Sequence, residues 1–349
     1  MRAAADAVGA AARYLASNAG LREAVGARDG EPLIPHPLGE GEHNQNFWFS
    51  CGGERFVLRV NVAPQPFHDN QVRYEFDALG ALTPSGCTPR PLYLDDGPGA
   101  PAHGALVTSF CPGRQLDFDH LRPGDLERVA ALMAAVHAVP VAPTCPLHRP
   151  ADPLRRLLDE CVARYRLYRE SPVEDARVTA WAERFLQAAA RAVEDAPPER
   201  GARRIINTEP LASHFLLDPD ARADGGLGGW YLDWERPVLG EVAQDVAYFL
   251  TPAATFWDSD HLITPDEAAN FVEDYWRAVD GRFPREGFDA RFPAYLALSA
   301  LRSVTWCCRA LITYRPGSDA HQTDKAAAKL PVLLSDDFME LMALQCLPR

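Results

Sequence analysis

Residues 204–250 of the chain read RIINTEPLASHFLLDPDARADGGLGGWYLDWERPVLGEVAQDVAYFL. Two short apolar runs in this stretch, Phe215–Leu217 and Trp230–Leu232, are predicted to be strands, and the glycine-rich DGGLGG before the second predicts a tight turn. Glu209 lies in the turn before the first strand, and Asp233 ends the second. We therefore expect a hairpin that brings two carboxylates together, an arrangement suited to metal and phosphate chemistry.

The composition is that of a folded protein with an acidic surface. The chain has 349 residues, 47% of them hydrophobic and 24% charged, which is enough for a large core and two domains. Its net charge of −13 argues against nucleic acid or a membrane surface as partner, because neither would find a basic patch. The eight cysteines form no CxxC pair, and no apolar run is long enough to span a membrane. We therefore expect a cytoplasmic protein, either a monomer or a homodimer.

The N-terminal part of the sequence predicts a helix followed by strands. Residues 3–18 have helical periodicity, and from Pro32 the pattern changes to strands separated by glycine-rich turns. In the strand RFVLRV, Arg59 alternates with apolar residues, so it would lie under the turn that contains Gly39 and Gly41. Glycines let backbone N–H groups approach an anion, which makes this a candidate phosphate site. An ordinary turn beside an exposed strand residue would produce the same pattern.

The rest of the chain predicts a second, helical lobe. A helix over residues 70–82 carries Glu75, and the strands PLYLD and GALVTSF follow it before the sequence Cys111-Pro112-Gly113. The later sequence is mainly helical, at residues 125–139, 154–170, 175–195, 241–250, 265–279, 290–314 and 335–345. We predict an α+β fold with a small antiparallel-sheet lobe at residues 1–110 and a larger helical lobe at 111–349.

This order of elements resembles the aminoglycoside phosphotransferase and choline kinase-like family, a branch of the protein-kinase-like fold. The resemblance runs from Pro35 to Tyr314, and its most specific part is LDWERPVLGEVAQDVAYFL, which matches the family's Asp-Trp-Glu segment followed by a helical aspartate. The other segments that carry it are LGEGEHNQNFWF, RFVLRV, YEFDALGAL, TSFCPGRQL and ALMAAVHAVP.

The resemblance implies a role for each matching residue. Arg59 would contact the nucleotide phosphates, with Glu75 as its partner, and Asp233 would bind the metal. Asp245 would support the catalytic loop. The remaining nucleotide-binding residues would be Gly39, Gly41 and Asn44 in the covering loop, and Ser109 and Cys111 in the segment that contacts adenine through its backbone.

The catalytic loop departs from the family pattern of His-Gly-Asp, four residues, then Asn. The sequence has Asn207-Thr208-Glu209, four residues, then His214. Glu209 keeps the carboxylate that orients the acceptor hydroxyl but moves it outward by about one methylene, and such a misplacement can cost roughly a hundredfold in rate. His214, the second predicted metal ligand, replaces a metal-binding asparagine, and an imidazole suits Mn²⁺ or Zn²⁺ better than Mg²⁺. The second metal is therefore lost, replaced, or held by the oxygen of Ser213.

Two functions follow from the resemblance. The first is a kinase that uses ATP or GTP with Mg²⁺, or Mn²⁺, to phosphorylate a hydroxyl of a small molecule. The second is a pseudokinase that senses a nucleotide or ligand without efficient transfer. The retention of Arg59, Glu75, Asp233 and an acid at position 209 favours the kinase.

The acceptor side is predicted from acidic and aromatic residues. Glu235, Asp258 and Trp306 are the candidates, since carboxylates and aromatic rings attract a cationic amine. Aromatic residues at helical spacing are also typical of a core. An amino sugar, an amino alcohol or a neutral sugar fits this composition.

Overall fold

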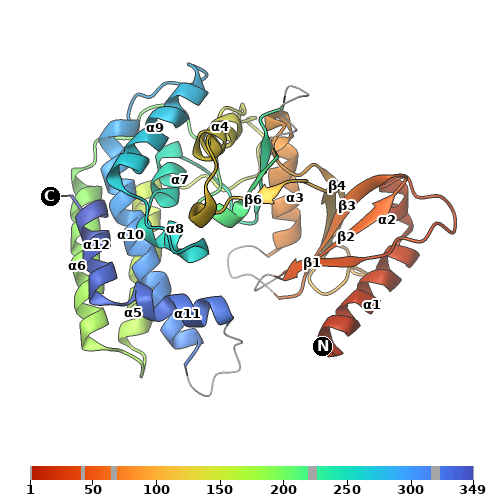
Figure 1. Cartoon of the computed structure of the whole chain (residues 1–349), viewed down its shortest axis with the longest axis horizontal. Coiled ribbons are helices and arrows are strands. Elements are labelled where there is room, and N and C mark those ends of the chain that lie inside the picture. Colours follow the sequence, from red (N-terminus) through yellow and green to blue (C-terminus); the bar gives the residue numbers. More distant parts are fainter. Residues whose placement is uncertain (1, 41–43, 64–68, 219–225, 316–322, 349) are drawn as a thin grey trace. The chain divides into compact units, whose positions relative to one another are not determined.

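The computed structural model describes residues 2–40, 44–63, 69–218, 226–315 and 323–348 (Figure 1). Contacts divide the chain into two compact units. The first unit comprises residues 1–114, 141–147 and 216–237, and the second comprises 115–140, 148–215 and 238–349. The predicted division at residues 110 and 111 differs from these units, because residues 216–237, which include Asp233, make their contacts within the first unit.

The first unit is built on an antiparallel five-stranded sheet with the strand order β1-β2-β3-β5-β4 (Figure 1). Its register places Phe49 of β2 opposite Phe56 of β3, and Arg59 of β3 opposite Leu106 of β5. The elements of this unit are α1 (Arg2–Ser17), α2 (Ala19–Ala24), β1 (His36–Glu40), β2 (Asn44–Cys51), β3 (Glu54–Asn61), α3 (Gln71–Leu82), η1 (Thr83–Ser85), β4 (Pro91–Asp95), β5 (Ala105–Ser109) and β9 (Gly229–Tyr231).

One face of β3 forms the core of the sheet, as its alternation predicts. Phe56, Leu58 and Val60 are buried in one cluster with Leu15 of α1 and Leu21 of α2. Side chains on successive residues of a strand point to opposite faces, so Arg59 leaves this cluster on the other side of the sheet. The predicted separation of Arg59 from the apolar face is therefore confirmed.

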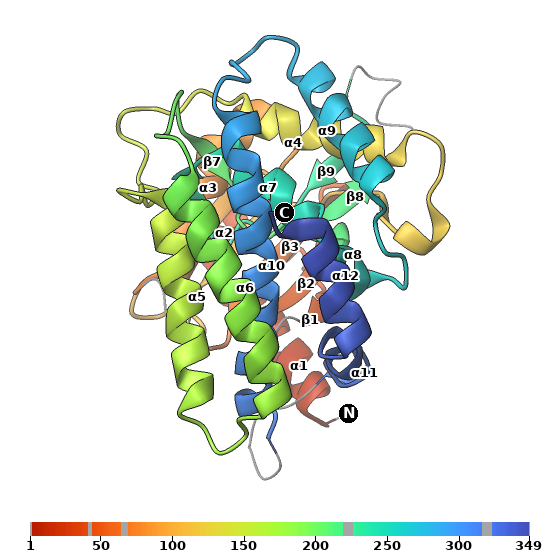
Figure 2. The same ribbon diagram turned by 90° about the vertical axis from the view of Figure 1, so that its left-hand side faces the viewer.

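The second unit is mainly helical. In Figure 2, α5, α6 and α10 run side by side, and α10 contacts α5, α6 and α7. The elements are η2 (Phe118–His120), α4 (Asp125–His137), α5 (Pro153–Arg169), α6 (Ala176–Asp195), β7 (Arg204–Ile206), η3 (Ala212–His214), β10 (Val238–Gly240), α7 (Val242–Phe249), α8 (Pro252–Asp258), α9 (Pro265–Val279), α10 (Phe288–Thr313), α11 (Asp324–Leu333) and α12 (Asp336–Cys346).

The predicted hairpin is present. β8 (Phe215–Leu217) and β9 are neighbours in a three-stranded sheet whose other strand is β6 (Arg114–Gln115). The N–H of Asp218 donates to the carbonyl of Gly228 over 3.0 Å, which closes the ladder beyond β8. Part of the predicted DGGLGG turn, residues 224 and 225, lies outside the described residues.

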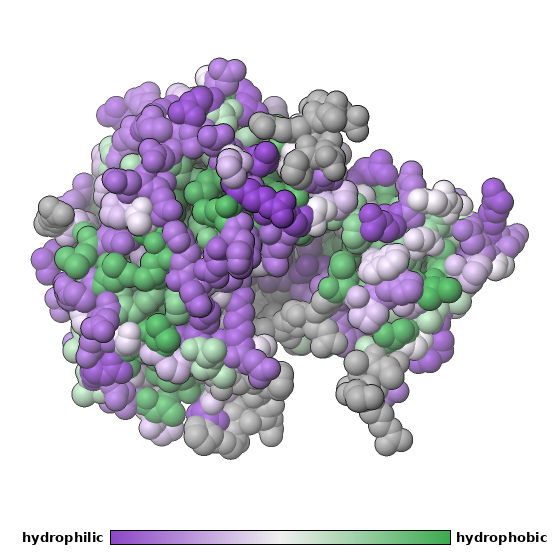
Figure 3. Space-filling model, viewed as in Figure 1, coloured by the Kyte–Doolittle hydropathy of each residue, from purple (hydrophilic) through white to green (hydrophobic). Residues whose placement is uncertain are grey.

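The surface is mostly polar. On the face shown in Figure 3, hydrophilic side chains predominate and hydrophobic ones lie among them. Within the described ranges, no helix is both long enough and apolar enough to cross a membrane.

Candidate functional site

The first unit contains an arginine surrounded by three carboxylates, which we call the arginine cluster: Arg59, Glu75, Asp233 and Glu235. The Nε of Arg59 lies 3.2 Å from Oε2 of Glu75, and its Nη2 lies 3.6 Å from Oδ1 of Asp233. The same Nη2 lies 2.9 Å from Oε2 of Glu235. The sequence assigned Glu235 to the acceptor, but the structure places its carboxylate on the predicted phosphate-binding arginine.

Three neighbours hold the arginine cluster in place. Asn44, at the start of β2, is buried and donates from Nδ2 to Oε2 of Glu235 over 3.1 Å. Gln71 of α3 donates to the backbone carbonyl of Glu235, and the hydroxyl of Tyr74 donates to the carbonyl of Pro237 over 2.5 Å. Sequence reasoning missed Gln71 and Tyr74. Gln71 precedes Glu75 by four residues and so shares its face of α3, which was a usable signal.

The backbone at Asp233 has an unusual conformation. Its φ is +61°, in the left-handed region that non-glycine residues rarely adopt, although aspartate is among the more tolerant. The next residue, Trp234, is fully buried, and its indole N–H donates to the carbonyl of Tyr231 over 2.9 Å. A buried indole thus holds the turn that presents Asp233, and strained positions of this kind concentrate at functional sites.

The charges of the arginine cluster do not balance, because three carboxylates share one guanidinium. Burial raises the pKa of Glu75 to about 7, helped by the charges of Glu235 and Asp233 and opposed by Arg59. Burial acts to lower the pKa of Arg59, but the three acids raise it above its usual range, so Arg59 stays charged. The excess negative charge and the hard oxygen donors suit a divalent cation such as Mg²⁺.

The acids alone do not form a complete metal cage. In the described part of the chain, no group of three or more His, Cys, Asp or Glu side chains is arranged to hold a metal ion. Mg²⁺ is commonly bound by one or two carboxylates together with water and substrate phosphates. The donor set of the arginine cluster, Asp233 with Glu235 beside it, fits that mode of binding.

The second unit contains the loop Asn207-Thr208-Glu209, which follows β7. The backbone N–H groups of Asn207 and Thr208 each donate to the carboxylate of Asp245 over 2.7 Å. Asp245, on α7, is fully buried and lies 3.2 Å from Nε2 of buried His137. Asp245 therefore supports this loop, as predicted, and His137 is part of the core.

Thr208 occupies the position of the family's glycine, and its backbone shows why a glycine suits that position. Its φ is +81°, which brings the Cβ of a β-branched residue into conflict with the backbone. Such a conformation costs about 1–3 kcal/mol and persists only where the surroundings enforce it. Here the surroundings are Asp245, which accepts from the Thr208 N–H, and Arg302, which donates to the Thr208 carbonyl over 2.7 Å.

Arg302 also forms an ion pair with Glu209. Arg302 lies on α10 and is 4% exposed, whereas the side chain of Glu209 is 33% exposed. Sequence reasoning missed Arg302. A charged residue inside the apolar run LSALRSVTWCC has mostly buried neighbours, and a buried charge needs a partner, so the signal was present.

The remaining predicted residues of the first unit lie in or beside the sheet. Gly39 is in β1 opposite Asn46 of β2, and Gly41 lies outside the described residues. Ser109 ends β5, and its Oγ accepts from the N–H of Arg90 over 2.9 Å. Cys111 is buried, and burial raises the pKa of its thiol to about 12.

The remaining predicted residues of the second unit lie around η3 and α8. His214 ends η3, and its Nδ1 accepts from the N–H of Leu211 over 3.5 Å. Asp258 accepts from the N–H of Ser213 over 2.7 Å and forms an ion pair with Lys325 of α11.

Trp306 packs against another tryptophan in this region. Its ring contacts that of Trp257 edge to face, with 4.9 Å between centroids. The ammonium of Lys325 lies 5.1 Å from the Trp257 ring. Asp258 and Trp257 therefore already hold the ammonium of Lys325, and Trp306 packs against Trp257, whereas Glu235 lies on Arg59.

Comparisons with known proteins give a family and a fold. The model of the phosphotransferase enzyme family (APH) matches residues 36–286. A search of curated proteins found no match.

Among solved structures, a candidate aminoglycoside phosphotransferase from Ralstonia eutropha has a TM-score of 0.65 at 15% identity, covering 95% of this chain and 97% of that one. A thermostable mutant of an aminoglycoside phosphotransferase in complex with ADP and hygromycin B has a TM-score of 0.59 at 17% identity, covering 93% and 97%. Plasmodium vivax ethanolamine kinase has a TM-score of 0.58 at 13% identity, covering 88% and 84%.

These identities are low, so the solved structures show the fold alone. The family model covers more than half of the chain and includes Arg59, Glu75, Glu209 and Asp233. The chain therefore belongs to the phosphotransferase enzyme family and has the mixed α+β, protein-kinase-like fold that its motifs predicted.

Proposed function

We propose that the protein transfers the γ-phosphoryl group of ATP or GTP to a hydroxyl of a small acceptor molecule. The arginine cluster carries this proposal, because it combines a largely buried guanidinium, 16% exposed, with an excess of carboxylate oxygens. Guanidinium groups bind phosphate oxygens, and carboxylates bind the Mg²⁺ that accompanies a nucleotide. A protein of similar fold has been solved with ADP, which supports a nucleotide as one substrate.

The proposal gives each candidate residue a task. Arg59 binds phosphate oxygens and is oriented by Glu75, while Asp233 holds Mg²⁺, with Glu235 as a neighbouring oxygen donor. Bound Mg²⁺ would neutralise charge on the phosphates. The proposed adenine contacts are backbone groups at Ser109 and Cys111, and the proposed phosphate contacts at the covering loop are Gly39, Gly41 and Asn44.

Glu209 is assigned to the acceptor. Its carboxylate accepts a hydrogen bond from the acceptor hydroxyl and so aims the oxygen lone pair at the γ-phosphorus. The acceptor oxygen forms a bond to phosphorus, the bond to the β–γ bridging oxygen breaks with its electron pair, and the nucleoside diphosphate leaves. The hydroxyl proton passes through Glu209 to water. Such transfers depend mostly on positioning and charge stabilisation.

The acceptor is proposed to be an amino sugar, an amino alcohol or a sugar. The similar structures include one with hygromycin B and one of an ethanolamine kinase, so both amine-bearing classes belong in the first test. Asp258 and Trp306 are the proposed acceptor-side residues. Because Asp258 already pairs with Lys325, a cationic acceptor would have to compete with that ammonium.

A nucleotide sensor without efficient transfer is the second candidate. The observation that favours it is the ion pair between Glu209 and Arg302, since a carboxylate held by a buried cation is a weaker base. His214 bears on the metal, because an imidazole at this position favours Mn²⁺ over Mg²⁺.

The test measures binding first and transfer second. Thermal shift and calorimetry with ATP and GTP, each with Mg²⁺, Mn²⁺ or chelator, should show metal-dependent binding. Turnover is then followed with hygromycin B, ethanolamine and neutral sugars as acceptors. Transfer to at least one acceptor supports the kinase, metal-dependent binding without any transfer supports the sensor, and absence of nucleotide binding contradicts both.

A further inference from the structure

Two arginines project from the same face of α10 and form separate ion pairs within the second unit. Arg291, Tyr295 and Arg302 are spaced by four and seven residues, so they lie along one stripe of the helix. Arg291 pairs with Glu241 at the start of α7, and Arg302 pairs with Glu209. The first pair includes no predicted catalytic residue, and the second includes one.

From this difference we infer that Arg302 is a positioning residue that fixes the Glu209 carboxylate toward the acceptor hydroxyl. The inference rests on the proposed function and names a further residue of the same site. One guanidinium donates both to the Thr208 carbonyl and to Oε1 of Glu209. A planar guanidinium with two such contacts fixes the main chain and the side chain of the loop in one geometry.

The length of the Glu209 side chain explains why such a residue is needed. Glutamate has one more rotatable bond than aspartate, so its carboxylate would sample more positions around the loop. The pair with Arg302 removes that freedom. The arginine and the glutamate are therefore expected to act as a unit.

Arg302 stays a cation in this pair despite its burial. Burial acts to lower its pKa, but the negative charges of Glu209 and Glu160 raise the pKa above its usual range. The ring of Tyr248 lies 5.4 Å from the guanidinium carbon. Arg302 therefore presents a fixed charge to Glu209, and Glu209 acts by orienting the hydroxyl rather than as a strong base, which suits a transition state with little proton transfer.

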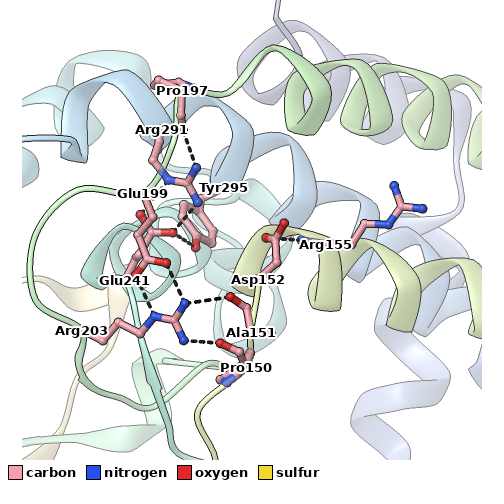
Figure 4. Close-up of polar contacts among 10 residues, drawn as sticks. All are labelled: Pro150, Ala151, Asp152, Arg155, Pro197, Glu199, Arg203, Glu241, Arg291 and Tyr295. Carbon is pink, nitrogen blue, oxygen red and sulfur yellow. Dashed lines mark hydrogen bonds and ion pairs between the residues drawn. The ribbon is translucent and has the colours of Figure 1, made fainter.

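A purely structural ion pair would have the same appearance, and the Arg291 pair supplies the control (Figure 4). Arg291 is 5% exposed, donates to both carboxylate oxygens of Glu241 over 2.7 and 2.6 Å, and donates to the carbonyl of Pro197 over 2.6 Å. It thus matches Arg302 in burial and in its type of partners, yet neither Glu241 nor Pro197 is a predicted catalytic residue.

The experiment compares Arg302→Lys, Arg291→Lys, Glu209→Gln and the double variant of positions 302 and 209. The probe is turnover of ATP and of GTP, each with Mg²⁺ or Mn²⁺, with water as acceptor and with any active acceptor of the panel. We expect Arg302→Lys to lower kcat by about a hundredfold while the nucleotide KM changes by less than about threefold. Arg291→Lys should lower the melting temperature about as much as Arg302→Lys does, but its kcat should stay within about threefold of that of the unaltered protein.

The double variant separates positioning from general stability. If Arg302 acts through Glu209, adding Arg302→Lys to Glu209→Gln costs no further kcat beyond about threefold. The inference is overturned if Arg302→Lys lowers kcat by the same factor in the unaltered protein and in Glu209→Gln. It is also overturned if the Arg302→Lys protein folds and its kcat is unchanged. Either result leaves the proposed function standing. Absence of turnover in the unaltered protein overturns the proposed function and, with it, this role of Arg302.

Glu209→Asp keeps the test decisive if Arg302→Lys does not fold. The substitution restores the family's aspartate at a part-exposed position but shortens the reach to Arg302. If Arg302 positions Glu209, Glu209→Asp should lower kcat by about tenfold or more. If the Glu209→Asp variant were as active as the unaltered protein, the pair with Arg302 would not be needed, and the inference would be overturned.

Discussion

The two arginine-centred groups differ in their balance of charge. Arg59 faces three carboxylates in the first unit, whereas Arg302 forms its ion pair with Glu209 in the second. Repulsion among clustered acids is relieved by another cation, so the arginine cluster is suited to binding one. The pair of Arg302 and Glu209 is already neutral, and its distinguishing property is geometry. Binding and orientation are therefore separate properties of the two groups, and variants can test each.

The largest expected effect is on Asp233. Asp233→Asn removes a charge and the better metal-binding oxygen, so turnover should fall by about a thousandfold or more, and the dependence of nucleotide binding on Mg²⁺ should weaken. Calorimetry with and without Mg²⁺ measures the second effect. Asp218→Asn, directly after the neighbouring strand β8, is the control. Retention of full metal-dependent binding would remove Asp233 from the metal site.

The next effect is on Arg59. Arg59→Met keeps most of the side-chain volume but removes the cation, so we expect nucleotide affinity to fall by about a hundredfold. Arg55→Met is the matched control, because Arg55 lies four residues earlier on the same strand and the same face, over the ring of Phe110. If Arg59→Met and Arg55→Met lowered nucleotide affinity equally, the effect would come from loss of positive charge on this face of β3 and not from the arginine cluster.

Glu75 gives the arginine cluster a dependence on pH. Because the pKa of Glu75 is raised to about 7 in the folded protein, the folded state binds a proton more tightly than the unfolded one. Stability should therefore fall as pH rises from about 4.5 to about 7, by up to about 3 kcal/mol from this group. In Glu75→Gln this part of the pH dependence disappears. Urea unfolding at a series of pH values between about 4.5 and 7 measures this dependence. If the free energy of unfolding changed with pH equally in the unaltered protein and in Glu75→Gln, the raised pKa of Glu75 would be contradicted.

The smallest effect concerns the loop held by Arg302. Thr208→Gly relieves a strained backbone but raises the entropy of the unfolded chain, so a net gain of about 1 kcal/mol in unfolding free energy is expected. Turnover should change little if Arg302 and Asp245 still hold the loop. Gly201→Ala, at another residue of positive φ, is expected to lose stability instead. A loss of stability in Thr208→Gly would mean that the threonine side chain, and not the backbone, matters there.

The sequence predicted most of the longer helices, the main strands and the alternation of β3, because these depend on local periodicity, but it did not predict α8 and α11. It also named Arg59, Glu75, Asp233 and Asn44, which the structure brings together, because each sits in a recognisable segment. The partners contributed by distant segments were harder to predict. Arg302 lies ninety-three residues from Glu209, and no local pattern connects them.

Glu235 and Asp258 illustrate a second limit of sequence reasoning. Both were assigned to the acceptor, Glu235 because it lies two residues after Asp233 and Asp258 because it is acidic and lies near aromatic residues. The structure gives each a cation from its own chain, Arg59 for Glu235 and Lys325 for Asp258. Composition identifies acids, but only the three-dimensional arrangement shows which of them already have a counter-ion.

The two lysines of the chain, Lys325 and Lys329, both lie on α11 and pair with Asp258 and Asp260 at the end of α8. Because the chain has so few lysines, α11 can be labelled selectively. An amine-directed label has no other lysine to modify, so its rate of attachment to lysine would report on a single helix. If an acceptor amine displaces Lys325 from Asp258, labelling of Lys325 should quicken as the acceptor binds, while Lys329 serves as the internal reference.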